Sequence, residues 1–149
     1  MTPGRAARRL LGPVFPLAGG LYRRVFVDMR RVAEFIAARL PKTARVLDVG
    51  GGDGLLADLL LDAREDITVA ILDLAAEVGG FVRQRHLPRT QFLPRTAIDE
   101  VQGRFDAMIM ADVLHHVELI QRAGFLTDAA TAAARTGCGT IFVKDIQPG

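Results

Sequence analysis

Residues 46–54 read Val46-Leu47-Asp48-Val49-Gly50-Gly51-Gly52-Asp53-Gly54, and they determine the architecture that we expect for the chain. Their first part is short and apolar, which is typical of a buried strand, and a helical pattern resumes at Leu55. Glycines between a strand and a helix let the backbone turn sharply and let a ligand approach it closely. The stretch therefore predicts a strand, a ligand-binding loop and a helix.

The glycine spacing separates this loop from common phosphate-binding loops. Counted from Gly50, a G-x-G-x-x-G dinucleotide fingerprint would need a third glycine at position 55, which is leucine. Counted from Gly51, it would need a second glycine where Asp53 stands. No Gly-Lys-Ser/Thr follows, and the carboxylate of Asp48 would repel a pyrophosphate. The loop therefore disfavours NAD, and with it a dehydrogenase, as well as ATP.

Strand-like and helical segments alternate along the rest of the chain. This alternation predicts crossover connections and a parallel sheet. We expect helices at 21–40, 55–61, 75–86 and 119–135, the last of them stopped by Gly137, and strands at 44–49, 67–72, 90–93, 105–110 and 140–143.

Several motifs, in this order, resemble those of class I S-adenosylmethionine-dependent methyltransferases. Residues 48–54 are similar to the first family motif, D/E-x-G-x-G-x-G, and Asp73 ends the second strand, where these enzymes place an acid on the ribose hydroxyls. Residues 105–117, which include His115 and His116, resemble the fourth-strand motif, and residues 136–145 resemble the turn into the fifth strand. The resemblance covers about residues 44–145.

The resemblance implies an α/β fold of the Rossmann-like, three-layer α/β/α kind, with S-adenosyl-L-methionine as the cofactor. The sheet would be mostly parallel, with about five strands in the order 3-2-1-4-5. The family sheet usually has seven strands, so we expect the C-terminal strands of the usual fold to be missing. The segment 140–143 would then form an open edge that favours self-association.

The resemblance also implies cofactor-binding residues. The loop and Asp48 would hold the methionine part, Asp73 the ribose, and Thr96, Ala97 and Asp112 the adenine side; the family often has Gly-Asp where Thr96-Ala97 stands here. Some of these assignments have a structural alternative. Asp48 would only orient the loop, and Asp73 would be a plain turn acid. Residues 111–112 would form an exposed turn. The full set is Asp48, Gly50, Gly51, Gly52, Gly54, Asp73, Leu74, Thr96, Ala97, Ala111 and Asp112.

His115 and His116 are the candidates for a catalytic proton shuttle. Methyl transfer to a nucleophilic acceptor needs little acid–base help, so the alternative is that one of them packs structurally. We expect no metal, because no third ligand of suitable spacing is apparent. Lys144 and Asp145 end the fifth strand and would either face the acceptor or pair with each other.

The 149 residues fit one domain, with an N-terminal basic arm and cover helix at 1–40 and the cofactor-binding domain at 41–149. The net charge of +2 does not argue for nucleic acid, and no apolar stretch is long enough to span a membrane. An apolar stretch near the N-terminus is too short and broken for an export signal, so we expect a cytoplasmic protein. The N-terminal arm also predicts weak contact with a membrane surface through its arginines, which are Arg5, Arg8, Arg9, Arg23, Arg24, Arg30 and Arg31.

The sequence thus predicts a methyltransferase that acts on an unidentified small-molecule or lipid-like acceptor. The alternative is a non-catalytic, methyltransferase-like binding module or inactive fragment that works through a partner chain.

Overall fold

The computed structural model describes residues 28–145. A helix over residues 28–37 precedes the sheet. The labelled helices and strands that follow are β1 (Arg45–Val49), α3 (Leu55–Ala63), β2 (Thr68–Leu72), β3 (Thr90–Leu93), β4 (Ala107–Ala111), α4 (Arg122–Thr136) and β5 (Thr140–Lys144). Short 3-10 turns occur at Gln84–Arg89, Ile98–Glu100, Leu114–His116 and Leu119–Gln121.

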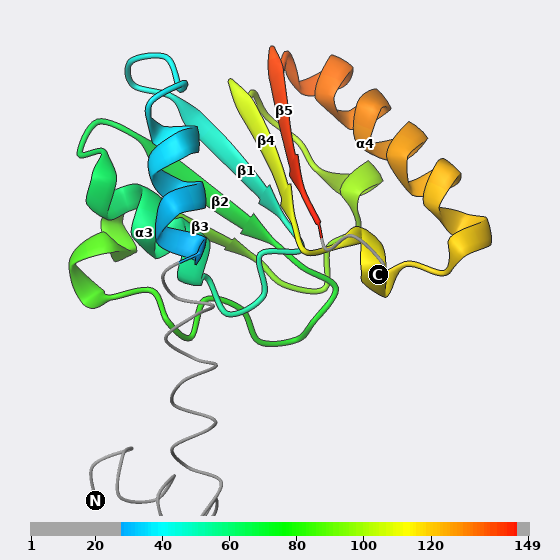
Figure 1. Cartoon of the computed structure of the whole chain (residues 1–149), viewed down its shortest axis with the longest axis horizontal. Coiled ribbons are helices and arrows are strands. Elements are labelled where there is room, and N and C mark those ends of the chain that lie inside the picture. Colours follow the sequence, from blue (N-terminus) through cyan, green and yellow to red (C-terminus); the bar gives the residue numbers. More distant parts are fainter. Residues whose placement is uncertain (1–27, 146–149) are drawn as a thin grey trace, which may run out of the picture.

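The five strands form one sheet in the order β3-β2-β1-β4-β5, which confirms the predicted topology (Figure 1). Every neighbouring pair is parallel, and Asp48 of β1 lies opposite Ile71 of β2 and Ile109 of β4. The arrowheads in Figure 1 therefore converge on one edge of the sheet. In open α/β sheets, ligands bind beyond this carboxyl edge, where the strand order reverses. Here that point lies between β1 and β4.

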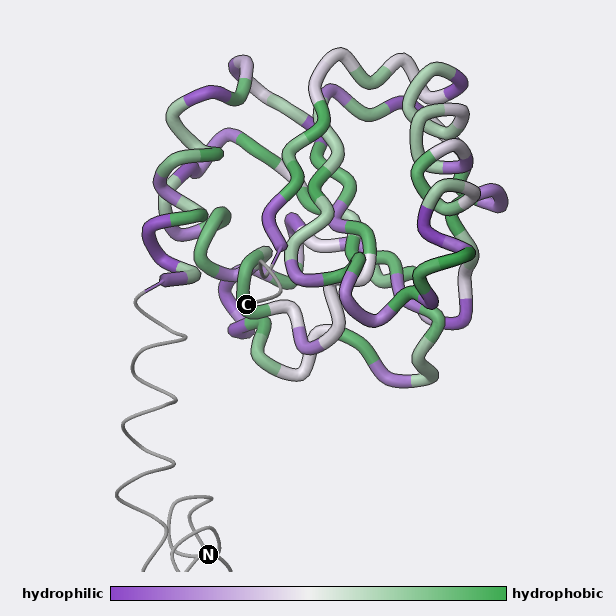
Figure 2. The backbone as a smooth tube through the Cα atoms, turned by 45° about the vertical axis from the view of Figure 1, so that its right-hand side comes forward, coloured by the Kyte–Doolittle hydropathy of each residue, from purple (hydrophilic) through white to green (hydrophobic). Residues whose placement is uncertain are grey.

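Two apolar cores cover the two faces of the sheet. The helix of residues 28–37 and α3 lie on one face, and α4 lies on the other (Figure 1). Along β1, Val46 belongs to the first core, whereas Leu47 and Val49 belong to the second. Accordingly, Figure 2, which colours the backbone by hydropathy, shows green, hydrophobic stretches in the centre of the molecule. Burial on both faces explains why these strands are continuously apolar.

The predicted helix at 75–86 is wrong. The chain instead makes bends up to the 3-10 turn of Gln84–Arg89. Gly79 has a φ of +76°, and a Cβ there would lie 2.0 Å from Cε1 of Phe92. Its amide donates to the oxygen of Gly52 rather than to a preceding turn. Contacts with the glycine-rich loop therefore replace helical hydrogen bonds in this segment.

The strand β5 lies at an edge of the sheet, as predicted, and Val143 is 53% exposed. The helix α4 ends at Gly137, whose φ of 74° confirms the predicted stop. Most of the basic arm, including Arg5 to Arg24, lies outside the described residues. Within residues 28–145, no helix has the length and apolarity that crossing a membrane requires.

Candidate functional site

The glycine-rich loop follows β1 at the carboxyl edge. The amides of Gly50 and Gly51 both donate to the oxygen of Leu72, at 2.7 and 3.3 Å, which extends the contact between β1 and β2 into the loop. The amide of Gly52 donates to Oδ2 of Asp73 at 2.9 Å. The loop and the end of β2 are thus one hydrogen-bonded unit.

Asp48 lies beneath this loop and is 1% exposed. A Cβ on Gly51 would lie 2.7 Å from Oδ2 of Asp48, so the loop can pass this close to the carboxylate only without a side chain there. Among the described residues, that Oδ2 has no hydrogen-bond partner. Burial, reinforced by the charges of Asp53 and Asp73, raises the pKa of Asp48 to about 7. The loop therefore covers a carboxylate that changes charge near neutral pH.

Two cavities open at this edge. The larger, of about 840 Å³, extends from the loop past the ends of β2 and β3 toward the start of α4. The smaller, of about 240 Å³, lies over Asp48 and reaches Met29 of the N-terminal helix. Gly50 and Asp112 line both cavities, so the two spaces meet where β1 and β4 end.

All of the predicted cofactor residues except Gly54 line these cavities. The larger cavity is lined by Gly50, Asp73, Leu74, Thr96, Ala97 and Asp112. The smaller is lined by Asp48, Gly50, Gly51, Gly52, Ala111 and Asp112. Gly54 lies outside these two linings, because it is buried at the start of α3, where a Cβ would meet Val82. Its contact with the cofactor stays a prediction.

The family model described as "Methyltransferase domain" matches residues 21–145. This chain belongs to the class I S-adenosylmethionine-dependent methyltransferases. The match confirms the family that the motifs suggested, and the observed sheet order is the one that the family resemblance implied.

Named methyltransferases are similar to the chain over part of their length. The "Ubiquinone biosynthesis O-methyltransferase" of Xanthomonas axonopodis pv. citri is 38% identical over 92 residues, which are 56% of this chain and 37% of that protein. The protein of the same name from Xylella fastidiosa is 33% identical over 122 residues, 76% of this chain and 47% of that protein. A solved O-methyltransferase of neocarzinostatin biosynthesis, NcsB1, has a TM-score of 0.55 and 26% identity, covering 76% of this chain and 38% of its own. The chain thus spans less than half the length of each of these relatives.

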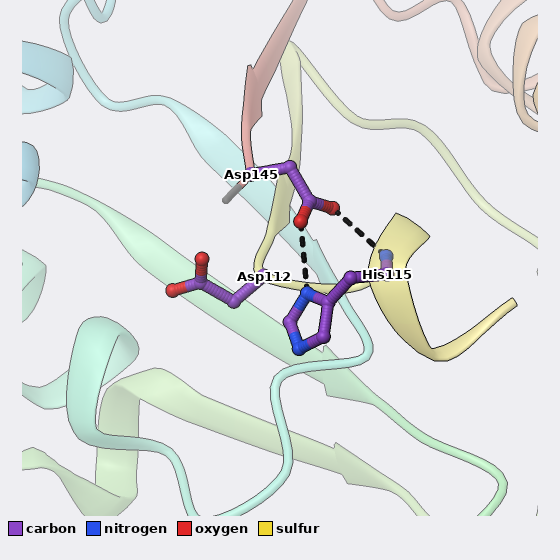
Figure 3. Close-up of side chains that lie close together, drawn as sticks. All are labelled: Asp112, His115 and Asp145. Carbon is purple, nitrogen blue, oxygen red and sulfur yellow. Dashed lines mark hydrogen bonds and ion pairs between the residues drawn. The ribbon is translucent and has the colours of Figure 1, made fainter. Parts of the chain in front are cut away.

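The two histidines of this methyltransferase domain lie in different surroundings. His116 lines the larger cavity. Nδ1 of His115 lies 2.8 Å from Oδ1 of Asp145, and Oδ2 of Asp145 accepts from the amides of Leu114 and His115 at 2.6 and 3.3 Å (Figure 3). Asp145 therefore fixes the orientation of the His115 ring through Nδ1, and Nε2 takes no part in this contact.

Asp112 completes this group. Its carboxylate, the His115 ring and Asp145 each have an atom within 4.8 Å of the others (Figure 3). The sequence reasoning that no third metal ligand stands near the histidines is therefore corrected. Nζ of Lys144 contacts both carboxylate oxygens of Asp112 at 2.6 Å, however, so we assign an ion pair and a hydrogen-bonded pair here rather than a metal centre. Lys144 pairs with Asp112 and Asp145 with His115, two residues that follow β4, and a position facing the acceptor stays a prediction for both.

Other cavity-lining residues were missed by the sequence analysis. Ile98 and Asp99 follow β3, while Ile120 and Phe125 lie where α4 begins. In the sequence these are ordinary apolar or acidic residues of connecting segments, and only the structure shows that Ile120 is 89% exposed. Periodicity alone cannot indicate that these segments meet.

Proposed function

We propose that this chain binds S-adenosylmethionine and transfers its methyl group to a hydroxyl of a small-molecule acceptor. The observation that carries the proposal is the pair of cavities that meet at Gly50 and Asp112. One is large enough and apolar enough for an adenosine, and the other adjoins it over a buried carboxylate.

The charges around the cavities fit this cofactor. Of the residues that the structure describes, no lysine or arginine lines either cavity, so a phosphate would find no cationic side chain there. Carboxylates line both, and the unpartnered Oδ2 of Asp48 suits a positively charged ligand above the loop. Asp73 would accept the ribose hydroxyls with lone pairs left by its bonds to the amides of Gly52 and Ala75.

When bound, S-adenosylmethionine supplies an electrophilic methyl group, whose bond to sulfur breaks as the acceptor oxygen attacks in line and leaves a neutral thioether. Asp112 marks the junction of the two cavities and thus the region of transfer. Nε2 of His115 would take the proton of the acceptor hydroxyl, and Asp145 would stabilise the resulting imidazolium. The choice of oxygen as the accepting atom is supported by the relatives, which are named O-methyltransferases.

Two measurements test the proposal. Isothermal titration with S-adenosylhomocysteine should show binding at one site, and transfer of labelled methyl should occur to 2-hydroxy-5-methyl naphthoic acid, the compound bound to NcsB1, or to other hydroxyaromatic probes. Absence of binding would refute the cofactor assignment.

The second candidate is the non-catalytic binding module. It is favoured by one observation, which is that β5 forms an edge of the sheet with Val143 53% exposed, because such an edge tends to pair with another chain. Binding of S-adenosylhomocysteine without transfer to any acceptor of the panel would select it.

A further inference from the structure

Residues 79–86, which we call the clasp, run beside the glycine-rich loop. The amide of Gly79 donates to the oxygen of Gly52 at 2.9 Å, and the amide of Phe81 donates to the oxygen of Asp53 at 2.8 Å. Both carbonyl groups belong to residues that line the smaller cavity. The clasp therefore holds the part of the loop that bends around this cavity.

Close packing supports these hydrogen bonds. A Cβ on Gly54 would lie 2.7 Å from Cγ2 of Val82 and 3.0 Å from Cα of Gly79. The ring of Phe92, from β3, occupies the space that a side chain on Gly79 would need. The clasp thus fills the space between the loop and the sheet, and neither can shift independently of it.

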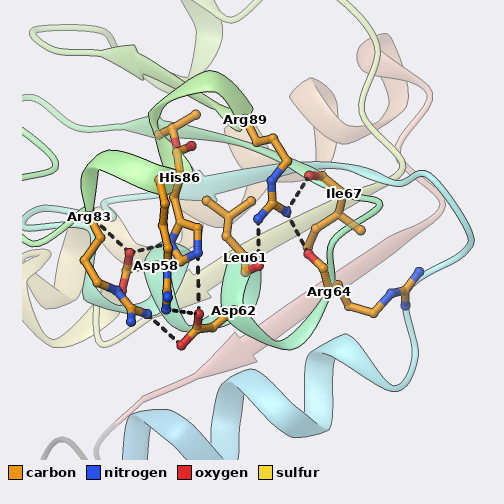
Figure 4. A network of polar contacts seen from close by, with 10 residues as sticks. Asp58, Leu61, Asp62, Arg64, Ile67, Arg83, His86 and Arg89 are labelled. Carbon is orange, nitrogen blue, oxygen red and sulfur yellow. Dashed lines mark hydrogen bonds and ion pairs between the residues drawn. The ribbon is translucent and has the colours of Figure 1, made fainter.

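Polar contacts, the innermost of them buried, attach the clasp to α3 (Figure 4). Nδ1 of His86 lies 2.6 Å from Oδ1 of Asp58, and His86 is only 3% exposed. The amide and Nε of Arg83 donate to the two oxygens of Asp58 at 3.0 and 2.7 Å, and Nη2 of Arg83 donates to Asp62 at 2.7 Å. Asp58 is itself in the first turn of α3, with its amide bonded to the oxygen of Gly54.

We propose that the clasp keeps the glycine-rich loop in its ligand-binding shape, and that His86 is the positioning residue that fixes the clasp by bonding to Asp58. The loop leads directly into α3, and the clasp returns to the same helix at Asp58. His86 therefore closes a ring of contacts around the loop. The prediction for ligand affinity rests on the proposed function; the prediction for the loop itself does not.

The 3-10 turn Gln84–Arg89, which contains His86, also offers a matched control. Arg89 donates to the oxygens of Leu61 and Arg64 at 2.9 and 2.7 Å, at the end of α3 that is far from the loop. Arg89→Met removes these bonds to α3 and leaves the contacts of Gly79 and Phe81 in place. If the polar contacts serve only general stability, Arg89→Met and His86→Leu should have the same effects.

Amide hydrogen exchange of the whole chain without ligand tests the clasp directly. In His86→Leu, the amides of Gly79 and Phe81 should exchange at least tenfold faster relative to the core amide of Val69. His86→Asn, whose side-chain amide takes the place of Nδ1–H, should restore their rates to within twofold of the parent, and Arg89→Met should leave them unchanged relative to Val69. Unchanged relative protection of Gly79 and Phe81 in His86→Leu would overturn the proposal.

Titration with S-adenosylhomocysteine tests the consequence for binding. We expect affinity to fall at least fivefold in His86→Leu and to stay within twofold of the parent in His86→Asn and Arg89→Met. Should His86→Leu not fold, Arg83→Ala carries the same expectations, because the Arg83 side chain is 44% exposed and also bonds to Asp58. Faster exchange at full affinity would refute the positioning role. A parent chain that binds no ligand would refute the proposed function, while the exchange rates would still decide whether the clasp exists.

Discussion

Replacing Asp48 by asparagine tests the electrostatics of the loop. The pKa of Asp48 rises from 3.8 to about 7 through burial, with Asp53 and Asp73 adding to the rise. Between these two pH values the folded state keeps a proton that the unfolded state has lost. Stability therefore falls as the pH rises from about 4 to about 7, and it levels off above that range. Asparagine cannot ionise, so Asp48→Asn should escape this loss.

The pKa difference sets the expected magnitude. The linkage between proton binding and folding predicts that the raised pKa of Asp48 lowers the free energy of unfolding of the parent by roughly 1.5 kcal/mol at pH 5 and by roughly 4 kcal/mol at pH 8. The stability gained by Asp48→Asn should therefore be larger at pH 8 than at pH 5 by the difference, roughly 2.5 kcal/mol. Even half of this gain would be large beside the total stability of a domain.

Urea unfolding of the parent and of Asp48→Asn at pH 5 and pH 8 measures the gain. Asp66→Asn is the control with the opposite sign, because bonds from Arg64 and from the amide of Thr43 lower the pKa of Asp66. That variant should be less stable than the parent at neutral pH, and the difference should vanish as the pH falls below the ordinary carboxyl pKa of 3.8. A gain for Asp48→Asn that is equal at pH 5 and pH 8 would refute the assignment of the raised pKa.

Three further variants test the site. Gly52→Val should reduce affinity for S-adenosylhomocysteine more than tenfold in a calorimetric titration, because position 52 has a φ of +49° and its Cβ would project beside Asp73; unchanged binding would place the ligand elsewhere. Asp73→Ala removes the acceptor of the Gly52 and Ala75 amides as well as the proposed ribose contact, so affinity should fall about tenfold or more in the same assay; a change below twofold would make Asp73 a turn residue only. Asp145→Asn should lower the rate of methyl transfer about 10²-fold while leaving the affinity for S-adenosylhomocysteine within twofold of the parent, because His115 loses the carboxylate that orients it; a parent-like rate would exclude His115 as the base.

Local sequence patterns predicted the strands and those cavity-lining residues that lie in the glycine-rich loop or directly after a strand. Residues 46–54 combine an apolar strand with closely spaced glycines, and both signals depend on neighbouring residues only. Asp73 and Asp112 were found for the same reason, since each directly follows an apolar strand.

Long-range contacts explain what the sequence did not predict. Residues 75–86 have enough helical character to suggest a helix, but their amides bond to the loop that lies more than 20 residues earlier. Asp145 meets His115 across 30 residues because β4 and β5 are neighbours in parallel register. Gly54 follows the motif spacing, yet its burial beside Val82 depends on the path of the later segment.

The parallel order of the strands has a consequence for how the protein acquires its binding site during folding. The central strand β1 is flanked by β2 and β4, and both of these come later in the chain. The two cavities therefore do not meet until about residue 112 has joined the sheet, after crossovers whose closure slows folding, and the larger one gains its last wall only when the start of α4 has packed. A nascent chain that ends before β4 would lack the junction at Asp112. Ligand-induced stabilisation would consequently report the assembly of β1 through β4 as one cooperative unit, and not the folding of the glycine-rich loop alone.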